Sequence, residues 1–346
     1  MNTNGWRFPA EWEKQQAILL CFPHNGNDWP GKYGAIQWAF VEFIKKIASR
    51  EEVFVVVADD KLKDRVLGML KTADVQVDRV SFIMHRTNRS WMRDAGPIIV
   101  KQGNKRAALN FNFNGWAKYN NYLLDRHVPG KVAEFLDIPL LDVIYKGRKV
   151  TLEGGAIDVN GKGSLITSEE CLLDPKIQVR NPGFTKEDYE NIFREYLGVT
   201  NTIWLGEGIK GDDTHGHIDD LARFVNEDTI VTVTESDPQN ENHRALKENL
   251  ERLENAVLEN GERPTLIKLP MPGKIIFDGI TIPASYANFL VINNSVLVPT
   301  FNDPRDRIAL NILSDAFPNH EVTGISAIDL IWGFGTLHCL SQQIPS

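Results

Sequence analysis

The stretch Gly335-Thr336-Leu337-His338-Cys339-Leu340-Ser341-Gln342-Gln343 places a thiol beside a histidine, directly after a glycine that lets backbone segments approach closely. We interpret this stretch as the last strand of the fold, with Cys339 as a candidate nucleophile that the preceding chain must hold in position. On a strand, His338 points to the face opposite Cys339, so it is not expected to be the base. Taken alone, a cysteine is more often a buried core residue than a catalyst.

The charge of the chain narrows the class of partner. The net charge is −8 and there is no basic block, which argues against nucleic acid or an anionic membrane and favours small cationic molecules. The beginning of the sequence has neither the basic nor the apolar region of a signal peptide. The longest apolar runs have the length of strands, and three cysteines make no disulfide framework. We therefore expect a cytoplasmic protein with no membrane segment.

Hydrophobic periodicity alternates along the chain between strands and amphipathic helices, which predicts an α/β protein. Units of a strand pair plus a helix recur about five times, and no Pro/Gly/Ser-rich linker divides them, so residues 1–346 are expected to form a single catalytic domain. Helices are expected at residues 34–48, 62–70, 122–136, 185–197, 246–257 and 305–316. Strands are expected at residues 17–22, 53–58, 75–84, 107–113, 138–145, 156–160, 163–167, 201–204, 217–225, 229–234, 265–269, 288–293 and 295–300, with a last one leading into Cys339.

His215, His217 and Asp219 occupy alternate positions of one short stretch. If this stretch is a strand, the three side chains share one face. His217 and Asp219 can then act as a base and its orienting carboxylate, or as two separate contacts to one substrate. A histidine satisfied in a polar core network is the structural alternative. His-x-His-x-Asp is also a metal-binding pattern, but the other histidines show no second metal-like spacing.

Two further segments carry carboxylates. Asp94 precedes Ala-Gly-Pro, a turn sequence that can leave a carboxylate at a strand end or simply cap the turn. Glu153 precedes two glycines, where a backbone can approach a ligand, although a surface turn fits equally well. Trp91 and Arg93 either wall a pocket or only pack. One thiol, one histidine and three carboxylates match a guanidinium ligand, which is planar, always charged and bound by carboxylates in bidentate fashion.

Five motifs in order resemble the agmatine deiminase family, which includes the bacterial peptidyl-arginine deiminases. The resemblance runs from about residue 10 to the end of the chain. It rests on Trp91-Met92-Arg93-Asp94-x-Gly96-Pro97, Glu153-Gly154-Gly155, Gly216-His217-Ile218-Asp219, Pro283-Ala284-Ser285-Tyr286-x-Asn288-Phe289 and His338-Cys339-x-x-x-Gln343. It implies five ββαβ-type units in a pseudo-fivefold α/β propeller with a central active site.

The same resemblance implies roles for individual residues. Cys339 is expected to be the nucleophile and His217 the general acid/base. Asp94 and Asp219 are expected to clamp the guanidinium, and Glu153 to lie near His217 as a further catalytic carboxylate. The substrate-binding residues implied are Asp94, Asp219, Trp91, Asp220 and Asn288. The carboxylates are expected to keep the Cys339 thiol protonated until a cation binds.

The implied reaction is the hydrolysis of agmatine to N-carbamoylputrescine and ammonia through a covalent cysteine intermediate, without a metal or organic cofactor. The chain departs from the family pattern at His215, Asp220, Phe334 and Thr336, which leaves the reacting groups in place but can reshape the pocket. Peptidyl-arginine or another alkylguanidine is the alternative substrate. A metallo-hydrolase and a guanidine- or polyamine-binding protein without turnover remain alternatives, and a homo-oligomer is compatible with the sequence.

Overall fold

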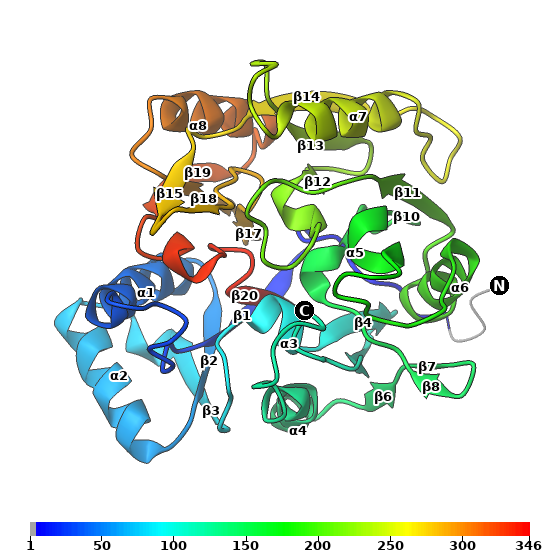
Figure 1. Cartoon of the computed structure of the whole chain (residues 1–346). Helices are drawn as coiled ribbons and strands as arrows, with labels where there is room; N and C mark the ends of the chain where they lie inside the picture. The colour runs from blue at the N-terminus through cyan, green and yellow to red at the C-terminus, as the bar shows by residue number, and fades with distance from the viewer. Residues whose placement is uncertain (1–4) are drawn as a thin grey trace.

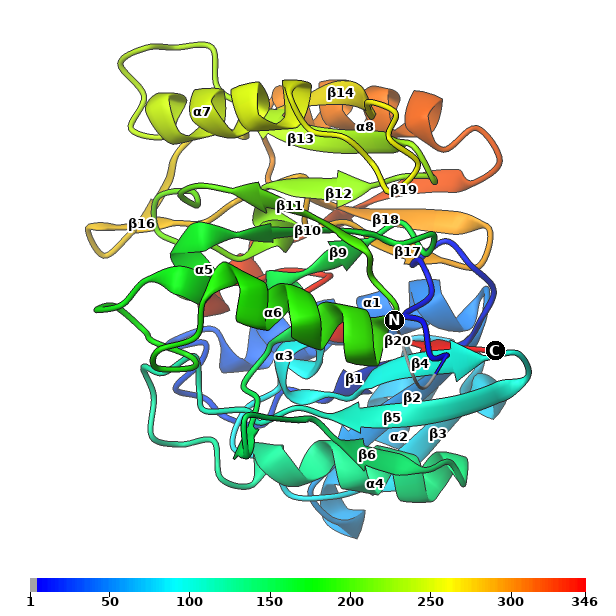
Figure 2. The same ribbon diagram turned by 90° about the vertical axis from the view of Figure 1, so that its right-hand side faces the viewer.

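The computed structural model describes residues 5–346 as a mixed α/β fold, which confirms the predicted class. The strands form several small sheets in the interior of the molecule, and the long helices lie at its periphery (Figure 1). The view turned by 90° shows the same layering, with α7 and α8 above their strands and α4 below (Figure 2). Among the described residues, no helix is long and apolar enough to cross a membrane.

The first sheet joins the two ends of the described chain. Its strand order is β20 (Ser341–Pro345), β1 (Gln15–Cys21), β2 (Glu52–Val57) and β3 (Val80–Met84). β1 pairs parallel with β2 and antiparallel with β20, so it is enclosed on both edges. The helices α1 (Tyr33–Ala48) and α2 (Asp60–Thr72) cover this sheet. The β-branched and apolar runs of β1 and β2 are buried almost throughout, as expected for strands covered on both faces.

Four further sheets share one pattern, in which an antiparallel strand pair is followed by a parallel third strand. They are β4 (Ile98–Gln102), β5 (Lys105–Asn110) and β6 (Leu140–Asp142); β9 (Asp158–Val159), β10 (Ser164–Ser168) and β11 (Asn201–Leu205); β12 (Ala222–Phe224), β13 (Thr229–Thr234) and β14 (Thr265–Pro270); β17 (Leu290–Ile292), β18 (Ser295–Thr300) and β19 (Glu321–Ser326). A helix precedes each third strand: α4 (Val128–Leu136), α6 (Lys186–Ile192), α7 (His243–Glu254) and α8 (Arg305–Ala316). Smaller elements are α3 (Met92–Ala95), α5 (Glu169–Leu173) and the strand pairs β7 (Ile144–Tyr145) with β8 (Arg148–Lys149) and β15 (Ile275–Phe277) with β16 (Ile280–Ile282).

Two predicted strands near the candidate site begin later than expected, because only Ala222–Phe224 (β12) of residues 217–225 form a strand and the last strand starts after Cys339. His217 does not lie on a strand, because the chain turns at His215 and Gly216 with φ of 67° and 85° and continues as a 3₁₀ turn over Ile218–Asp220. The Asp212 carboxylate accepts hydrogen bonds from the backbone N–H groups of Gly216 and His217 and holds this turn. Cys339 also precedes its strand, since residues 337–340 form turns and β20 begins only at Ser341.

Candidate active site

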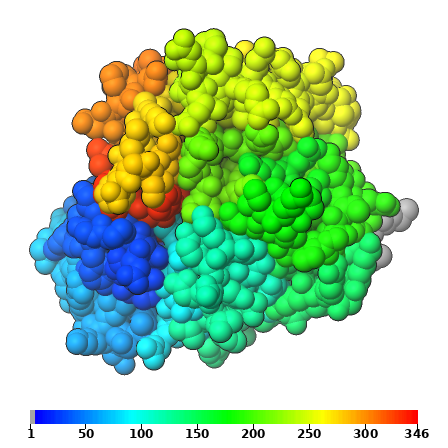
Figure 3. Space-filling model, viewed as in Figure 1, coloured from blue at the N-terminus to red at the C-terminus, as the bar shows by residue number. Residues whose placement is uncertain are grey.

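Cys339 lies at the wall of a pocket in the interior of the molecule. Its side chain is 8% exposed, and in the space-filling view the red C-terminal segment is seen between the blue N-terminal and yellow segments (Figure 3). The pocket is lined by Arg89, Trp91, Asp94, Trp116, Asp213, Thr214, Gly333, Phe334, Gly335 and Cys339. A side chain at position 335 would collide with Trp91, 2.7 Å from the Cβ it would introduce, so the tight fit of this loop requires glycine there.

Asn288 organises the loop that carries the thiol. Its side-chain N–H donates to the Sγ of Cys339 at 3.0 Å and to Oδ1 of Asp220 at 3.1 Å. Its oxygen accepts from the Thr336 hydroxyl at 2.6 Å and from the backbone N–H of His338 at 3.1 Å. The structure therefore places the predicted substrate ligand Asn288 against the predicted nucleophile, where it donates to the thiol, and Thr336 holds Asn288 in position.

Asp94 presents a carboxylate to the same pocket. It is buried at the end of α3, where its Oδ1 accepts from the backbone N–H of Gly155 at 3.1 Å and its Oδ2 accepts from the indole N–H of Trp116 at 2.8 Å. Burial raises the pKa of Asp94 to about 6, with the charges of Asp219 and Glu153 acting in the same direction and His217 opposing them. A bound cation would favour its ionised form.

Asp219 lies on the other side of the thiol, with its Oδ2 3.5 Å from the Sγ of Cys339. The same oxygen accepts from Nδ1 of His338 at 2.7 Å. Burial alone would raise the pKa of Asp219, but this bond and the charges of His338, His217 and Arg223 together lower it. Among the described residues, no group donates a hydrogen bond to its Oδ1. For the neighbouring Asp220, burial and then the charge of Asp219 raise the pKa well above the usual range. Asp219 is therefore the ionised member of the pair, and its Oδ1 is a buried acceptor without a partner among the described residues.

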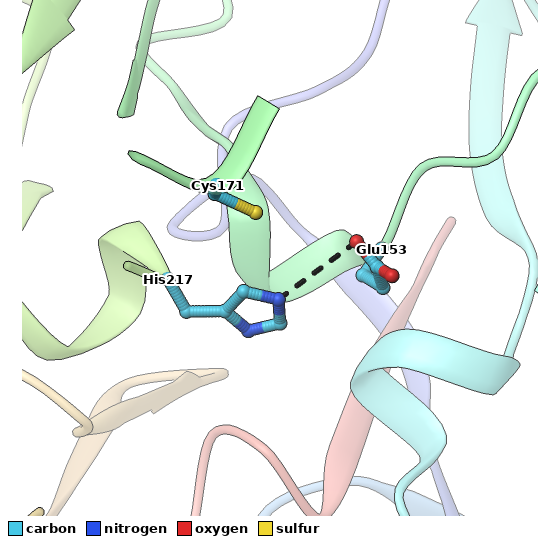
Figure 4. Close-up of side chains that lie close together, drawn as sticks. All are labelled: Glu153, Cys171 and His217. Carbon is cyan, nitrogen blue, oxygen red and sulfur yellow. Dashed lines mark ion pairs between the residues drawn. The ribbon is translucent and has the colours of Figure 1, made fainter. Parts of the chain in front are cut away.

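His217 is fully enclosed between carboxylates from two segments. Its Nδ1 lies 3.9 Å from Oδ1 of Asp94, and its Nε2 lies 3.9 Å from Oε2 of Glu153 (Figure 4). Burial lowers the pKa of His217, but Asp94, Cys171 and Glu153 outweigh it and raise the pKa well above its ordinary value. An imidazolium is therefore available to donate a proton in the resting site.

The ionised form of Glu153 is stabilised by Arg180, a residue that was not predicted from the sequence. The Nε of Arg180 donates to Oε1 of Glu153 at 3.1 Å, and both side chains are completely buried. Burial alone would raise the pKa of Glu153, but the Arg180 guanidinium, together with His217, lowers it to about 2. Glu153 is thus a permanent anion behind His217.

The buried carboxylates around Cys339 disfavour the ionised form of its thiol. Burial raises its pKa well above the ordinary value, and Asp219, Asp220 and Asp94 raise it further, while the hydrogen bond from Asn288 opposes them. This direction is the one expected from the sequence, since neighbouring carboxylates disfavour a thiolate.

Trp91 lines the pocket, whereas Arg93 does not. Trp91 lines the pocket and packs against Trp29, with the ring centroids 5.3 Å apart. Arg93 is buried and does not line the pocket; its Nη1 donates to Oε1 of Gln342 at 2.7 Å and also to Gln343. Of the two roles considered from the sequence, Arg93 takes the structural one and anchors β20 to α3.

A buried ionic cluster beneath the site was not anticipated from the sequence. Glu11 accepts from Nε2 of His338 at 2.9 Å and from the guanidinium of Arg223, whose Nε also binds Asp158 at 3.0 Å. His338 therefore bridges Glu11 and Asp219 and orients the latter. Glu11 carries no motif, and only its proximity in the fold reveals this role.

The metal site considered from the sequence is not formed, because His215 and His217 face different groups. The His215 ring binds Oδ2 of Asp174 at 3.0 Å and faces Glu170, while His217 faces Asp94 and Glu153, so the two histidines do not converge. A different trio, Glu153, Cys171 and His217, has ligand atoms within 4.8 Å of one another (Figure 4). Arg180 already neutralises Glu153 there, and its positive charge opposes a cation at this point.

Comparison with known proteins decides the family. The model of the Porphyromonas-type peptidyl-arginine deiminase family matches residues 7–345. The chain belongs to this family. It is 32% identical over 367 residues to the agmatine deiminase of Pseudomonas syringae pv. syringae (strain B728a), covering 99% of this chain and 96% of that protein.

Two solved structures of deiminases superpose on this family member along its whole length. The agmatine deiminase of Enterococcus faecalis gives a TM-score of 0.92 at 27% identity, covering 100% of this chain and 97% of that one. A cysteine-to-serine variant of C. jejuni agmatine deiminase with substrate bound gives a TM-score of 0.88 at 31% identity, covering 99% and 96%. The resemblance seen in the five motifs is confirmed.

Proposed function

We propose that this deiminase hydrolyses the guanidinium group of agmatine to N-carbamoylputrescine and ammonia. The observation that carries the proposal is the position of the Cys339 thiol, which lines one pocket with Asp94 and lies 3.5 Å from Asp219. Two carboxylates beside one thiol suit a planar cation with several N–H donors. The similar proteins named agmatine deiminase, one of them solved with substrate bound, support the same choice.

Binding of the cation prepares the nucleophile. The guanidinium N–H groups donate to Asp94 and to the free Oδ1 of Asp219, which places the central carbon near Sγ of Cys339. The positive charge of the substrate offsets the carboxylates that raise the pKa of the thiol. The thiol therefore ionises when substrate is present and releases its proton to solvent, with Asn288 donating to the thiolate.

The first half of the reaction breaks a C–N bond. The Cys339 thiolate attacks the guanidinium carbon and forms a C–S bond and a tetrahedral intermediate. His217 donates its proton to the departing nitrogen, ammonia leaves, and an amidino-thioether remains on Cys339. Glu153 and Asp94 stabilise the imidazolium before this transfer.

Water completes the second half. Neutral His217 takes one proton from water as the oxygen attacks the amidino carbon. The second proton of that oxygen passes to solvent, and the C–S bond breaks to release the ureido product and the Cys339 thiolate. The balance is one guanidinium cation and one water converted to the ureido product and ammonium, since ammonia takes up the released proton, with no electron transferred. This hydrolysis therefore calls for neither a metal nor an organic cofactor, and the partner is the small cation itself.

We extend the proposal to the architecture and the domain. The repeated pattern of an antiparallel strand pair, a helix and a parallel strand supports five ββαβ-type units around a pseudo-fivefold axis. The pairing of β20 with β1 supports a closed arrangement of one catalytic domain with the site near its centre.

The deciding experiment measures ammonia release from agmatine, free arginine and a blocked arginine peptide, with Cys339→Ala as the control. Turnover of agmatine alone, lost in the variant, is the expected result. Turnover of the peptide alone keeps the mechanism and makes peptidyl-arginine the substrate. Ligand-dependent stabilisation without ammonia from any of them would overturn the proposal in favour of a binding protein.

A further inference from the structure

The imidazole of His217 has two edges with different surroundings. Its Nδ1 edge faces Asp94, which lines the pocket together with Cys339. Its Nε2 edge faces Glu153, which is completely buried and does not line the pocket. Nδ1 therefore faces a carboxylate that lines the pocket, and Nε2 faces a carboxylate that does not.

The Nε2 atom lacks a strong partner although it is sealed from water. His217 is 1% exposed, and no described residue forms a hydrogen bond to this nitrogen. Glu153 is 3.9 Å away, too far for a hydrogen bond, and its oxygens already accept from Arg180. A buried N–H group without any acceptor is costly, so a weaker acceptor nearby becomes important.

Cys171 places a candidate acceptor close to this nitrogen. Its side chain is 2% exposed, and its sulfur lies on the same side of the imidazole as Glu153, with the three ligand atoms within 4.8 Å of one another (Figure 4). The backbone N–H of Cys171 donates to the Ser168 hydroxyl at 3.1 Å, and that hydroxyl donates to the backbone oxygen of Gly216. One serine thus ties the backbone of Cys171 to the residue directly before His217.

We propose that Cys171 is a positioning residue for the reaction, whose sulfur accepts from Nε2–H of His217 and leaves Nδ1 as the nitrogen that exchanges protons with substrate and water. The tautomer of a histidine follows the hydrogen bond that its other nitrogen makes. Sulfur is a weak acceptor, so it directs the ring without holding its proton permanently. The thiol is not a second nucleophile, because it does not line the pocket. The inference rests on the proposed function for its kinetic part only.

The groups that face His217 set the expected pH response. They are Asp94 near Nδ1, with Glu153 and Cys171 on the Nε2 side, and Arg180 behind Glu153. Removal of the Cys171 sulfur takes away one contribution that raises the pKa of His217, whereas Asp94 and Glu153 stay. The Cys171→Ala variant should therefore titrate His217 at lower pH than the parent protein.

The first test needs no turnover. ¹⁵N NMR of the His217 ring in Cys339→Ala protein, with and without Cys171→Ala, reports the tautomer and the pKa directly. We expect an Nε2-protonated neutral ring with Cys171 present, and a mixed tautomer with a lower pKa without it. The same tautomer and the same pKa in both proteins would overturn the proposal, whatever the protein catalyses.

The second test uses the otherwise native enzyme. Cys171→Ala should lower kcat about tenfold, leave KM within about twofold and shift the pH profile of kcat to lower pH. Cys171→Ser, which restores an acceptor, should recover much of the loss. Cys21→Ala is the matched control, because Cys21 is an equally buried free thiol that contacts Thr87 instead. An unshifted pH profile of kcat in Cys171→Ala, or an equal loss of kcat in Cys21→Ala, would overturn the proposal and assign Cys171 to packing alone. If none of the substrates releases ammonia, the proposed function is refuted, but the NMR result on His217 stays valid.

Discussion

Asn288 donates a hydrogen bond to the sulfur of Cys339 at 3.0 Å, inside a site where every neighbouring carboxylate opposes the thiolate. The amide lowers the pKa of this thiol, whereas burial and the charges of Asp219, Asp220 and Asp94 raise it. It is neutral, so it can stabilise the thiolate without attracting the anionic side chains around it or repelling a cationic substrate. We therefore expect the resting enzyme to resist neutral alkylating reagents and to become reactive when a cation binds.

This field predicts a charge-dependent reactivity of Cys339. A cationic haloacetamidine should alkylate Cys339 at least about tenfold faster than the neutral haloacetamide of similar size, because the carboxylates attract it and it promotes ionisation. Mass spectrometry of the modified peptide, followed over time, measures both rates. Asp94→Asn should reduce the ratio. Equal rates for the two reagents in the native protein would sink this account of the site.

Thr336 should matter through Asn288. Thr336→Val keeps the volume of the side chain but removes the hydroxyl that donates to Oδ1 of Asn288 at 2.6 Å. We expect about 1 kcal/mol less stability and a fall in kcat of about tenfold, since the amide that supports the thiol becomes less ordered. Denaturant unfolding and steady-state kinetics measure the two effects. Thr336→Ser retains the donor and should behave almost as the native protein; a loss as large as that of the valine variant would refute the explanation.

Glu11 should be essential for stability although it lies outside the pocket. Glu11→Gln leaves Arg223 and His338 without their shared anionic partner in a buried cluster, and we expect a loss of about 3 kcal/mol in the free energy of unfolding. The matched control is Glu13→Gln, which breaks an ion pair with Arg7 at the surface and should change stability by less than about 1 kcal/mol. Equal effects of the two substitutions, measured by urea unfolding, would contradict the role of the cluster.

His215 should be dispensable for catalysis. Its ring contacts Asp174 and Glu170 outside the pocket, and its φ of 67° is one that asparagine tolerates. His215→Asn should therefore keep kcat/KM within about threefold, and chelators should not change the activity of either protein. Activity lost on chelation and restored by a divalent metal would instead support the metallo-hydrolase alternative.

Glu51 should make stability fall as the pH rises. Burial raises its pKa from 4.5 to about 7, with one hydrogen bond from the backbone of Asn293 opposing the shift. The folded state thus keeps a proton that the unfolded state releases, so stability is lost as the pH rises from about 4.5 through 7, by about 3 kcal/mol at most.

The isosteric Glu51→Gln variant tests this linkage. It should raise Tm at pH 8 and leave Tm at pH 4.5 nearly unchanged, because the buried charge is absent in both forms at low pH. Glu52→Gln, at the exposed neighbouring position, serves as the control and should shift neither value. A Tm difference that does not depend on pH would exclude ionisation of Glu51 as its cause.

Local patterns predicted much of the fold. The helix expected at residues 305–316 matches α8, and the apolar runs of β1, β2 and β13 lie within a residue or two of their predicted bounds. These segments are long and strongly periodic, so their own burial decides their structure. The strand expected at residues 217–225 is found only at Ala222–Phe224, because the carboxylate of Asp212 and a glycine with positive φ impose a turn around His217. Hydrophobic periodicity does not indicate such a contact.

Some residues of the candidate site were predicted from sequence motifs, and others were not. The motifs brought Cys339, Asp94 and His217 to one place, and they assigned Glu153 to the neighbourhood of His217. They did not indicate Arg180, Glu11 or Cys171, which act through other residues and show no spacing of their own. Arg180 could have been suspected only by asking which cation neutralises a buried Glu153. Side chains that support a site are visible once distances are known.

The contact between Glu11 and His338 joins residues 327 positions apart, and it lies directly under the nucleophile. Closing so long a loop lowers the chain entropy before any stabilising contact forms, so we expect this cluster to form late in folding. A refolding population should regain its helical signal before it regains a competent site. Until that moment the Cys339 thiol lacks the shielding that burial provides, which makes the half-folded molecule the species most vulnerable to oxidants.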